Sequence, residues 1–405
     1  MIRLGQWAGR PVNISIKPNC ITVSVDRPEE TSVFSFDYAG RLWTAFLDGV
    51  SYRRGLDGKM IAKWRLPGNA RERRWVPRPE ALQIEETARR QTEALYAAIQ
   101  SGEATLNAPL PPDGDHGFRQ AIAFDGERSQ ADAERYHAIY KPVGILPPDQ
   151  YMAVVLQATE GCSFNTCTFC DFFRDRPFRI KPPDEFRAHA QAVRGYLGEG
   201  FSLRRTIFLG DANALVIPMP RLVSLMEIVH EVYDVHGLEG IYAFLDGFSG
   251  ERKSAEDYRA LADLGLAMVY IGLESGSADL LRFLKKPAMP DEVIHAVRAL
   301  KQGGVSVGLI VLLGAGGHTY AEEHVRETIN VLNAMELDGG DLIYFSELVV
   351  SDNLPYARDA YQAGLQPLTA EERIAQGEAI EAGLRFADEA DSPRISRYDI
   401  REFIY

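Results

Sequence analysis

From Tyr151 onward, strand-like apolar runs alternate with helix-like segments, and this alternation constrains the fold more than any other feature. Six runs rich in apolar and β-branched residues cover 152–158, 206–210, 241–245, 268–273, 305–314 and 341–345. Helices are expected between them, at about 184–197, 220–234, 254–264, 290–302 and 319–335. Runs without polar alternation are typical of strands buried on both faces of a helix-covered parallel sheet. The sequence therefore predicts an α/β fold, either a partial (β/α)6 TIM-like barrel or a doubly wound open sheet.

The N-terminal part of the chain has a different pattern. Polar and apolar residues alternate through residues 11–65 with turn residues between the runs, which predicts a small antiparallel β domain. A helix is expected over 79–100, and 102–115 is expected to be a loop or linker because it is rich in Pro, Gly and Asp. All four Trp lie in the first 75 residues, which favours a compact core over a ligand cage. A chain of 405 residues exceeds one ordinary core. We therefore expect an N-terminal β unit with helix and linker over 1–115, a barrel over 140–350 and a C-terminal helical extension over 351–405.

Composition limits the partners. No run approaches the length of a membrane span and the first residues lack the apolar region of a signal peptide, so we expect a cytoplasmic protein with reduced thiols and no membrane contact. The net charge of -13 argues against a nucleic-acid coat. A basic stretch from Arg53 to Arg90 nevertheless surrounds Trp64 and Trp75. It suits a phosphate-bearing or stacked ligand, but a solvated face beside a small core is the favoured interpretation.

Three of the four cysteines stand together just after the first barrel strand, where functional groups of such folds lie. Cys162, Cys167 and Cys170 have C-x4-C-x2-C spacing, so their thiolates can face one inorganic centre. Structural zinc needs four closed ligands, and the nearest downstream histidine is His189. A plant-type 2Fe-2S cluster needs a fourth cysteine downstream, whereas Cys20 lies upstream. Both alternatives stay open at this point. Three cysteines on a 4Fe-4S cluster would leave one iron free to bind a cofactor.

The cysteine segment resembles that of the radical S-adenosylmethionine (radical SAM) superfamily. The usual spacing there is C-x3-C-x2-C with an aromatic residue before the last cysteine; this chain has one extra residue and keeps the aromatic as Phe169. Residues 270–287, YIGLESGSADLLRFLKKP, are similar to the signature of radical enzymes related to the Elongator catalytic subunit. The resemblance covers roughly residues 140–350. It implies a partial barrel, a 4Fe-4S cluster and S-adenosylmethionine (SAM) as cofactor.

The resemblance also implies roles for single residues. Gly210 and Asp211 match the element that contacts the SAM amino group, and Glu274 would accept hydrogen bonds from the SAM ribose or amino group. The remaining implied cofactor contacts are Phe169, Gly272, Ser275, Lys286 near the methionine carboxylate, and Gly314 near the adenine. The implied activity is reductive cleavage of SAM to a 5′-deoxyadenosyl radical, which takes a hydrogen atom from an unidentified substrate. Such an enzyme is oxygen-sensitive and needs a one-electron donor such as flavodoxin or ferredoxin.

The substrate is less constrained, and we expect a small or nucleotide-like molecule. The lack of further cysteines argues against an auxiliary cluster. Candidate substrate contacts near strand ends or in the C-terminal tail are Asp246, His318, Tyr344, Glu347, Arg397 and Arg401. His318 and His324 are interpreted as surface histidines. Three arginines after the cysteines, Arg174, Arg176 and Arg179, are further candidates but are equally able to pair with Asp171 and Asp175. The alternative function is a non-catalytic iron-sulfur or zinc protein whose N-terminal β unit binds nucleic acid.

Overall fold

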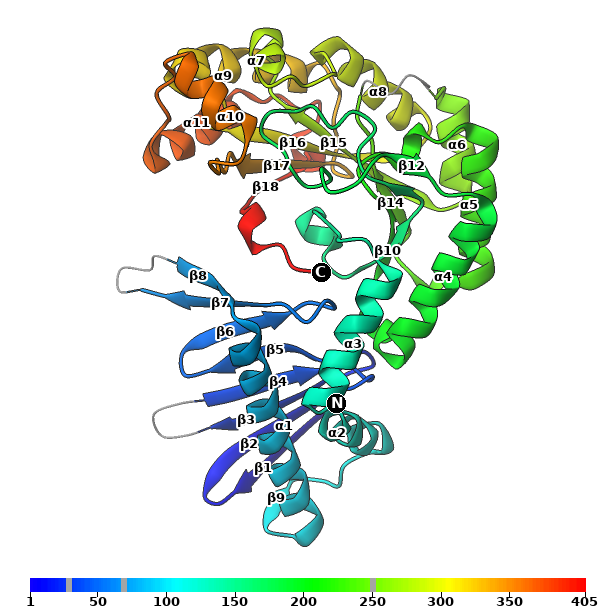
Figure 1. Ribbon diagram of the computed structural model, residues 1–405, viewed down its shortest axis with the longest axis vertical. Coiled ribbons are helices and arrows are strands. Elements are labelled where there is room, and N and C mark those ends of the chain that lie inside the picture. Colours follow the sequence, from blue (N-terminus) through cyan, green and yellow to red (C-terminus); the bar gives the residue numbers. More distant parts are fainter. Residues whose placement is uncertain (27–30, 67–70, 248–252) are drawn as a thin grey trace. The chain divides into compact units, whose positions relative to one another are not determined.

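The computed structural model describes residues 1–26, 31–66, 71–247 and 253–405, without the side chain of Arg71. The backbone divides into two compact units (Figure 1). Met1–Pro142, Gln191–Arg205 and Ile404–Tyr405 form the first unit, and Val143–Ala190 with Thr206–Phe403 form the second. The limits expected from the sequence, at residues 115, 140 and 350, stay a proposal. No helix in the described ranges is long and apolar enough to cross a lipid bilayer.

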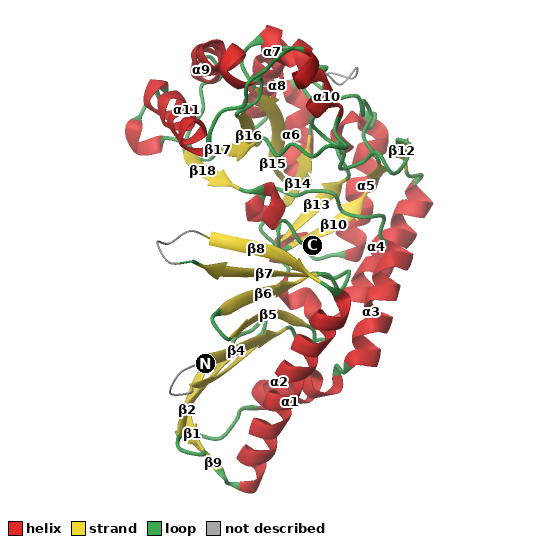
Figure 2. Ribbon diagram, turned by 60° about the vertical axis from the view of Figure 1, so that its left-hand side comes forward, coloured by secondary structure: helices red, strands yellow, loops and turns green. Residues whose placement is uncertain are grey.

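The first unit is built on a nine-stranded antiparallel sheet with the order β8-β7-β6-β5-β4-β3-β2-β1-β9. Alternation of buried and exposed residues along β2 and β3 points Val12, Ile14 and Val23 into the core. Helices α1 and α2 pack on that side of the sheet (Figure 2). The bounds are β1 Ile2–Trp7, β2 Arg10–Ile16, β3 Ile21–Asp26, β4 Thr31–Phe36, β5 Leu42–Leu47, β6 Val50–Arg54, β7 Met60–Arg65, β8 Arg71–Val76, α1 Arg78–Ser101, β9 Ala104–Leu106, α2 Pro112–Ala123 and α3 Gly126–Ile139.

Two expectations for this unit are wrong in part. The segment 102–115 is not a plain linker, because it contains β9 and the start of α2. Pro112 begins α2, where proline is tolerated since its missing N–H would have no helical partner. The tryptophans are not uniformly part of a core: Trp7 and Trp64 pack against it, but Trp75 is 51% exposed.

The basic stretch is largely paired with neighbouring acids. Residues 67–70 and the Arg71 side chain lie outside the described residues. Ion pairs to carboxylates involve Arg54, Lys59, Arg74, Arg78, Arg89 and Arg90. This pairing favours the interpretation of the stretch as a structural and solvated surface.

The second unit contains a seven-stranded parallel sheet, ordered β10-β13-β14-β15-β16-β17-β18. Since this order follows the chain, the sheet is not doubly wound, and the unit is a partial α/β barrel (Figure 1). The strands are β10 Ala153–Gln157, β13 Thr206–Gly210, β14 Ile241–Phe244, β15 Leu266–Glu274, β16 Ser306–Leu313, β17 Leu342–Glu347 and β18 Arg394–Tyr398. The helices are α4 Pro183–Leu197, of which the residues from Gln191 on belong to the first unit, α5 Met219–Val232, α6 Ala255–Asp263, α7 Ala278–Phe283, α8 Pro290–Gln302, α9 Gly317–Asn333, α10 Pro355–Gln362 and α11 Ala370–Gly383.

The first six strands overlap the six predicted runs, but the seventh strand differs from expectation. The C-terminal segment contains β18 as well as α10 and α11, so it is not purely helical. β18 pairs in parallel with β17, with Ser346 opposite Tyr398. An edge strand of five residues with only partial burial has no long apolar run to reveal it. Because β18 is parallel to β17, its carboxyl end lies on the same side of the sheet as the carboxyl ends of the other six strands.

A buried ion pair in the first unit provides a test of the fold. Asp132 accepts hydrogen bonds from Arg41 Nε and Nη2, at 3.0 and 2.8 Å, and both side chains are buried. Asp132→Ala removes one of the carboxylates that pair with the buried Arg41 guanidinium. We therefore expect the free energy of unfolding, determined by urea denaturation, to fall by about 3–5 kcal/mol. Arg90→Ala removes an exposed ion pair and should cost no more than about 1 kcal/mol. Equal losses in the two variants would contradict a structural role for the Arg41–Asp132 pair.

Candidate functional site

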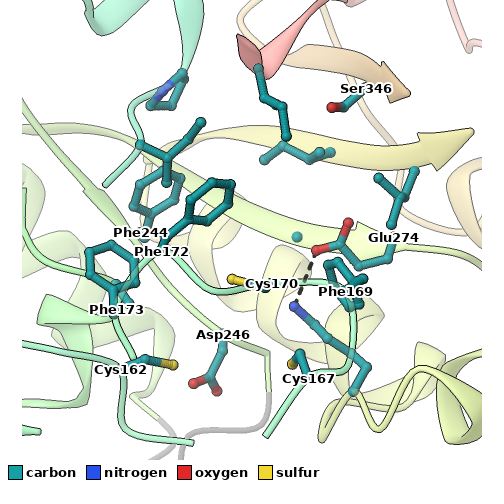
Figure 3. A pocket seen from close by; sticks show the side chains of 18 of the residues that line it. Cys162, Cys167, Phe169, Cys170, Phe172, Phe173, Phe244, Asp246, Glu274 and Ser346 are labelled. Carbon is teal, nitrogen blue, oxygen red and sulfur yellow. Dashed lines mark hydrogen bonds and ion pairs between the residues drawn. The ribbon is translucent and has the colours of Figure 1, made fainter. Parts of the chain in front are cut away.

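The candidate site is a cavity of about 200 Å³ in the second unit, at the carboxyl ends of its strands (Figure 3). The walls come from residues before β10, from the loop with the three cysteines, from the ends of β14 to β18 and the residues after β13, β14, β17 and β18, and from Lys286 after α7. The lining residues are Ile145, Pro147, Cys162, Cys167, Phe169, Cys170, Phe172, Phe173, Ala212, Phe244, Leu245, Asp246, Gly272, Glu274, Lys286, Ile310, Leu312, Ser346, Leu348, Val349, Tyr398 and Ile400. All three clustered cysteines therefore open on one cavity.

The cysteine loop is closed at its base by a two-stranded antiparallel sheet, β11 Thr159–Glu160 with β12 Arg179–Ile180. Glu160 stabilises this closure by accepting hydrogen bonds from Arg179 and from Lys181 Nζ, each at 2.7 Å. Within the loop, Arg174 Nη2 donates to the carbonyl oxygen of Cys167 at 2.6 Å. The backbone is thus tethered on both sides of the thiols.

Burial governs the chemistry of the thiols. It raises the pKa of Cys167 to about 11 and that of Cys170 to about 12. Both thiols hold their protons at neutral pH, and a metal centre would replace those protons. In the described ranges no three His, Cys, Asp or Glu side chains are placed to hold a single metal ion. His189, the histidine considered for zinc, accepts a hydrogen bond from the backbone N–H of Gln157 at 3.0 Å and does not line the cavity.

A buried ion pair, Glu274 with Lys286, lies close to Cys167 in the cavity wall. β15 ends in a register shift between Gly272 and Glu274, and Glu274 has a left-handed backbone with φ of 60°. This irregularity directs the Glu274 carboxylate into the cavity, with Oε1 3.4 Å from Lys286 Nζ (dashed in Figure 3). Burial raises the pKa of Glu274, partly opposed by Lys286. Burial also opposes the charge on Lys286, but Glu274 and other neighbouring acids keep the pKa of Lys286 above its usual value.

Gly272 makes room for this pair. A Cβ atom at Gly272 would lie 2.2 Å from Glu274 Oε1 and 3.0 Å from Lys286 Nζ. No larger residue fits there without moving the two charges.

The sequence that forms this site was compared with models of known protein families. Residues 156–332 match the family model of the radical SAM superfamily. This chain carries a radical SAM domain. The matched segment begins in β10 and ends in α9, so it contains the cysteine loop and the Glu274–Lys286 pair. The finer resemblance, to the Elongator catalytic subunit, stays a prediction. A search of curated proteins found no match.

Solved structures of similar fold are distant. The cobalamin-dependent radical enzyme OxsB is 17% identical over 57% of this chain and 30% of its own, with a TM-score of 0.35. The radical SAM methyltransferase TsrM from Kitasatospora setae is 15% identical over 56% of this chain and 44% of its own, with a TM-score of 0.41. Coproporphyrinogen III oxidase (HemN) from Escherichia coli is 12% identical over 57% of this chain and 54% of its own, with a TM-score of 0.40. The matched regions thus span about a third to a half of those chains.

The residues present fit the cofactors of the superfamily, a 4Fe-4S cluster and SAM. Three thiols on one tethered loop are a suitable ligand set for a cluster with one open iron. Phe169 lines the cavity and also packs against the apolar cluster around Leu280 and Leu284. The Glu274–Lys286 pair offers one acceptor and one donor of opposite charge to the amino, carboxylate and hydroxyl groups of a ligand.

Asp211, by contrast, is occupied elsewhere. Its carboxylate accepts hydrogen bonds from Gln157 Nε2 at 2.8 Å, from the Gly161 backbone at 2.9 Å and from Arg176 Nη2 at 2.9 Å. Neither Gly210 nor Asp211 lines the cavity, although the next residue, Ala212, does. The expected contact of Asp211 with SAM stays a prediction, whereas the structure gives its side chain a role in anchoring the cysteine loop.

Two further expected cofactor contacts also lie off the cavity wall. Ser275 Oγ hydrogen-bonds with His324 Nδ1 at 2.7 Å, and the Gly314 N–H donates to Gln376 Oε1 at 2.8 Å. The interpretation of His324 as a surface residue is wrong, because it is completely buried and burial lowers its pKa to about 4. His318 is exposed as expected, with 52% of its side chain accessible.

Of the candidate substrate contacts, Asp246 alone lines the cavity. It accepts hydrogen bonds from Asn213 Nδ2 at 2.7 Å and Ser163 Oγ at 3.2 Å. The others bond elsewhere: Tyr344 to Asp149, Glu347 to Arg373, Arg397 to the Ile374 carbonyl, and Arg401 to Asp399. Arg176 pairs with Asp175, as considered, and also with Asp211; Arg179 pairs with Glu160 and Glu185.

Sequence reasoning missed several wall residues, among them Phe172, Phe244, Val349, Tyr398 and Ile400. Phe244 is the last residue of β14, so its place at a strand end was available as a signal. Tyr398 and Ile400 had none, because β18 was not predicted.

Gly272→Ala tests the geometry of the ion pair. The added methyl group would displace Glu274 and Lys286, so we expect the dissociation constant of SAM to rise about tenfold or more while the iron content is unchanged. Equilibrium dialysis of SAM with the cluster-loaded protein measures this dissociation constant. The control is Gly195→Ala, whose Cβ would meet nothing within 4 Å. Unchanged SAM binding in Gly272→Ala would show that the pair does not contact the cofactor.

Proposed function

We propose that the protein is a radical SAM enzyme acting on a small molecule. When bound, the cluster and SAM supply a 5′-deoxyadenosyl radical, made by one-electron cleavage of SAM, that takes a hydrogen atom from the substrate. One observation carries the proposal: the three thiols and the Glu274–Lys286 pair open on the same cavity at the strand ends of a radical SAM domain.

Each part of the wall has a proposed task. Cys162, Cys167 and Cys170 would hold the cluster. Lys286 binds a carboxylate and Glu274 binds an ammonium or hydroxyl group, so the buried pair orients the cofactor from two sides. Apolar side chains around them exclude water, which protects a reactive species from side reactions.

The proposed partners follow from this chemistry. A one-electron donor such as flavodoxin or ferredoxin would provide the electron, and the site would be oxygen-sensitive. A cytoplasmic location is proposed as well, because the buried thiols must stay reduced before the cluster is assembled.

Anaerobic reconstitution tests the proposal. The wild-type protein should take up about four irons and form 5′-deoxyadenosine from SAM when dithionite is present. Cys167→Ala removes one of the three proposed ligands. We therefore expect the rate of 5′-deoxyadenosine formation to fall at least about a hundredfold, because even residues that only support a metal ligand cost 10–100-fold when they are changed. The matched control is Cys20→Ala, a buried cysteine of the first unit, which should keep both iron and activity.

Two outcomes would overturn the proposal. One is a wild-type protein that binds iron or zinc but does not cleave SAM, which would favour the non-catalytic alternative. The other is full activity in Cys167→Ala, which would show that the cluster is held elsewhere.

A further inference from the structure

The cavity wall divides into a charged side and an apolar side. Figure 3 shows Phe172, Phe173 and Phe244 together on one side, and Cys167 with Glu274 on the other. Further apolar residues of the cavity wall come from separate segments: Pro147 before β10, Val349 after β17 and Ile400 after β18. A ligand that extends from the charged side therefore meets a hydrocarbon surface from several directions.

The charges on the wall do not favour an anion. Among the described lining residues the charged side chains other than the cysteines are Asp246, Glu274 and Lys286, with no arginine or histidine. Lys286 pairs with Glu274 and is assigned to the carboxylate of the cofactor in the proposed function, and Asp246 adds a second carboxylate. A phosphate entering the apolar side would lose its water without gaining a cationic partner, which is costly.

The arginines that sequence reasoning placed near the site do not change this balance. Arg174 donates to the Cys167 carbonyl, Arg397 donates to the Ile374 carbonyl, and Arg401 pairs with Asp399. None of the three lines the cavity. The expectation of a nucleotide-like substrate therefore finds no phosphate partner among the described wall residues.

The cavity wall also contains a neutral polar feature, on the side of Glu274 (Figure 3). Ser346 at the end of β17 lies opposite Tyr398 at the end of β18, and both side chains line the cavity. Their hydroxyl groups can bind a hydroxyl or carbonyl oxygen without requiring charge.

Resting on the proposed function, we propose that the substrate is a neutral, largely hydrocarbon molecule with at most a hydroxyl or carbonyl group. Its apolar part binds against Phe172, Phe244 and Ile400, and its oxygen binds near Ser346 and Tyr398. Nucleotides and other phosphate-bearing molecules find no cationic partner among the described residues on this side.

A charge series on a constant aromatic body tests the substrate class. Benzyl alcohol, benzylamine and benzyl phosphate are titrated into the cluster-loaded, SAM-bound full chain, and binding is followed by saturation-transfer NMR. We expect benzyl alcohol to bind at least about tenfold more tightly than benzyl phosphate. Equal or tighter binding of benzyl phosphate, or tighter binding of benzylamine than of the alcohol, would overturn the proposal.

A pair of neighbouring variants locates the binding side. Val349→Arg places a guanidinium on the apolar wall and should make benzyl phosphate bind at least as tightly as the alcohol. Val350→Arg, at a position that is 47% exposed and off the wall, should leave the wild-type order unchanged. If the two variants behave alike, the compounds bind elsewhere and the proposal fails. The wild-type series requires no variant, so it decides the question even if Val349→Arg does not fold.

The proposed function is measured separately, as dithionite-dependent 5′-deoxyadenosine formation without any of these compounds. Its absence would refute radical SAM activity, whereas a reversed charge preference in an active protein would refute only the substrate class.

Discussion

A parallel sheet brings the carboxyl ends of all its strands to one edge, and the candidate site depends on this constraint. The strands β13 to β18 follow one another in chain order, so the loops after them meet around one cavity. Groups that are far apart in sequence therefore lie close together: the cysteines and aromatic rings of the first loop, the ion pair at the end of β15 and apolar side chains from the other strand ends. The helices that connect the strands are needed for burial of the sheet, whereas the loops remain available for chemistry.

The Glu274–Lys286 pair is the least expected part of this site in energetic terms. A buried ion pair is weak evidence for stability, because desolvation of two charges offsets their attraction. Here the chain also adopts a left-handed, non-glycine conformation at Glu274 and keeps Gly272 free of a side chain. Strain of this kind persists where the surrounding structure holds it, and it is concentrated at functional sites. We therefore interpret the pair as a ligand-binding device.

Patterns local in sequence predicted the barrel. Long apolar runs revealed six strands. The spacing of Cys162, Cys167 and Cys170 indicated that their thiolates can face one inorganic centre, and in the structure all three line one cavity. Properties set by distant contacts were not predictable: Asp211 follows a strand as expected, but Arg176 and Gly161 bind its carboxylate. His324 is buried because α9 turns it towards Ser275, and Tyr398 reaches the cavity through an edge strand too short to recognise.

Electron paramagnetic resonance of the reduced, cluster-loaded protein tests the central claim most directly, because the spectrum reports on the ligands of the iron. If an open iron faces the Glu274–Lys286 pair, adding SAM changes the spectrum of the wild-type protein. Lys286→Met should then require about tenfold more SAM for the same change, since one charged contact is lost. A wild-type spectrum that SAM leaves unchanged would contradict the account.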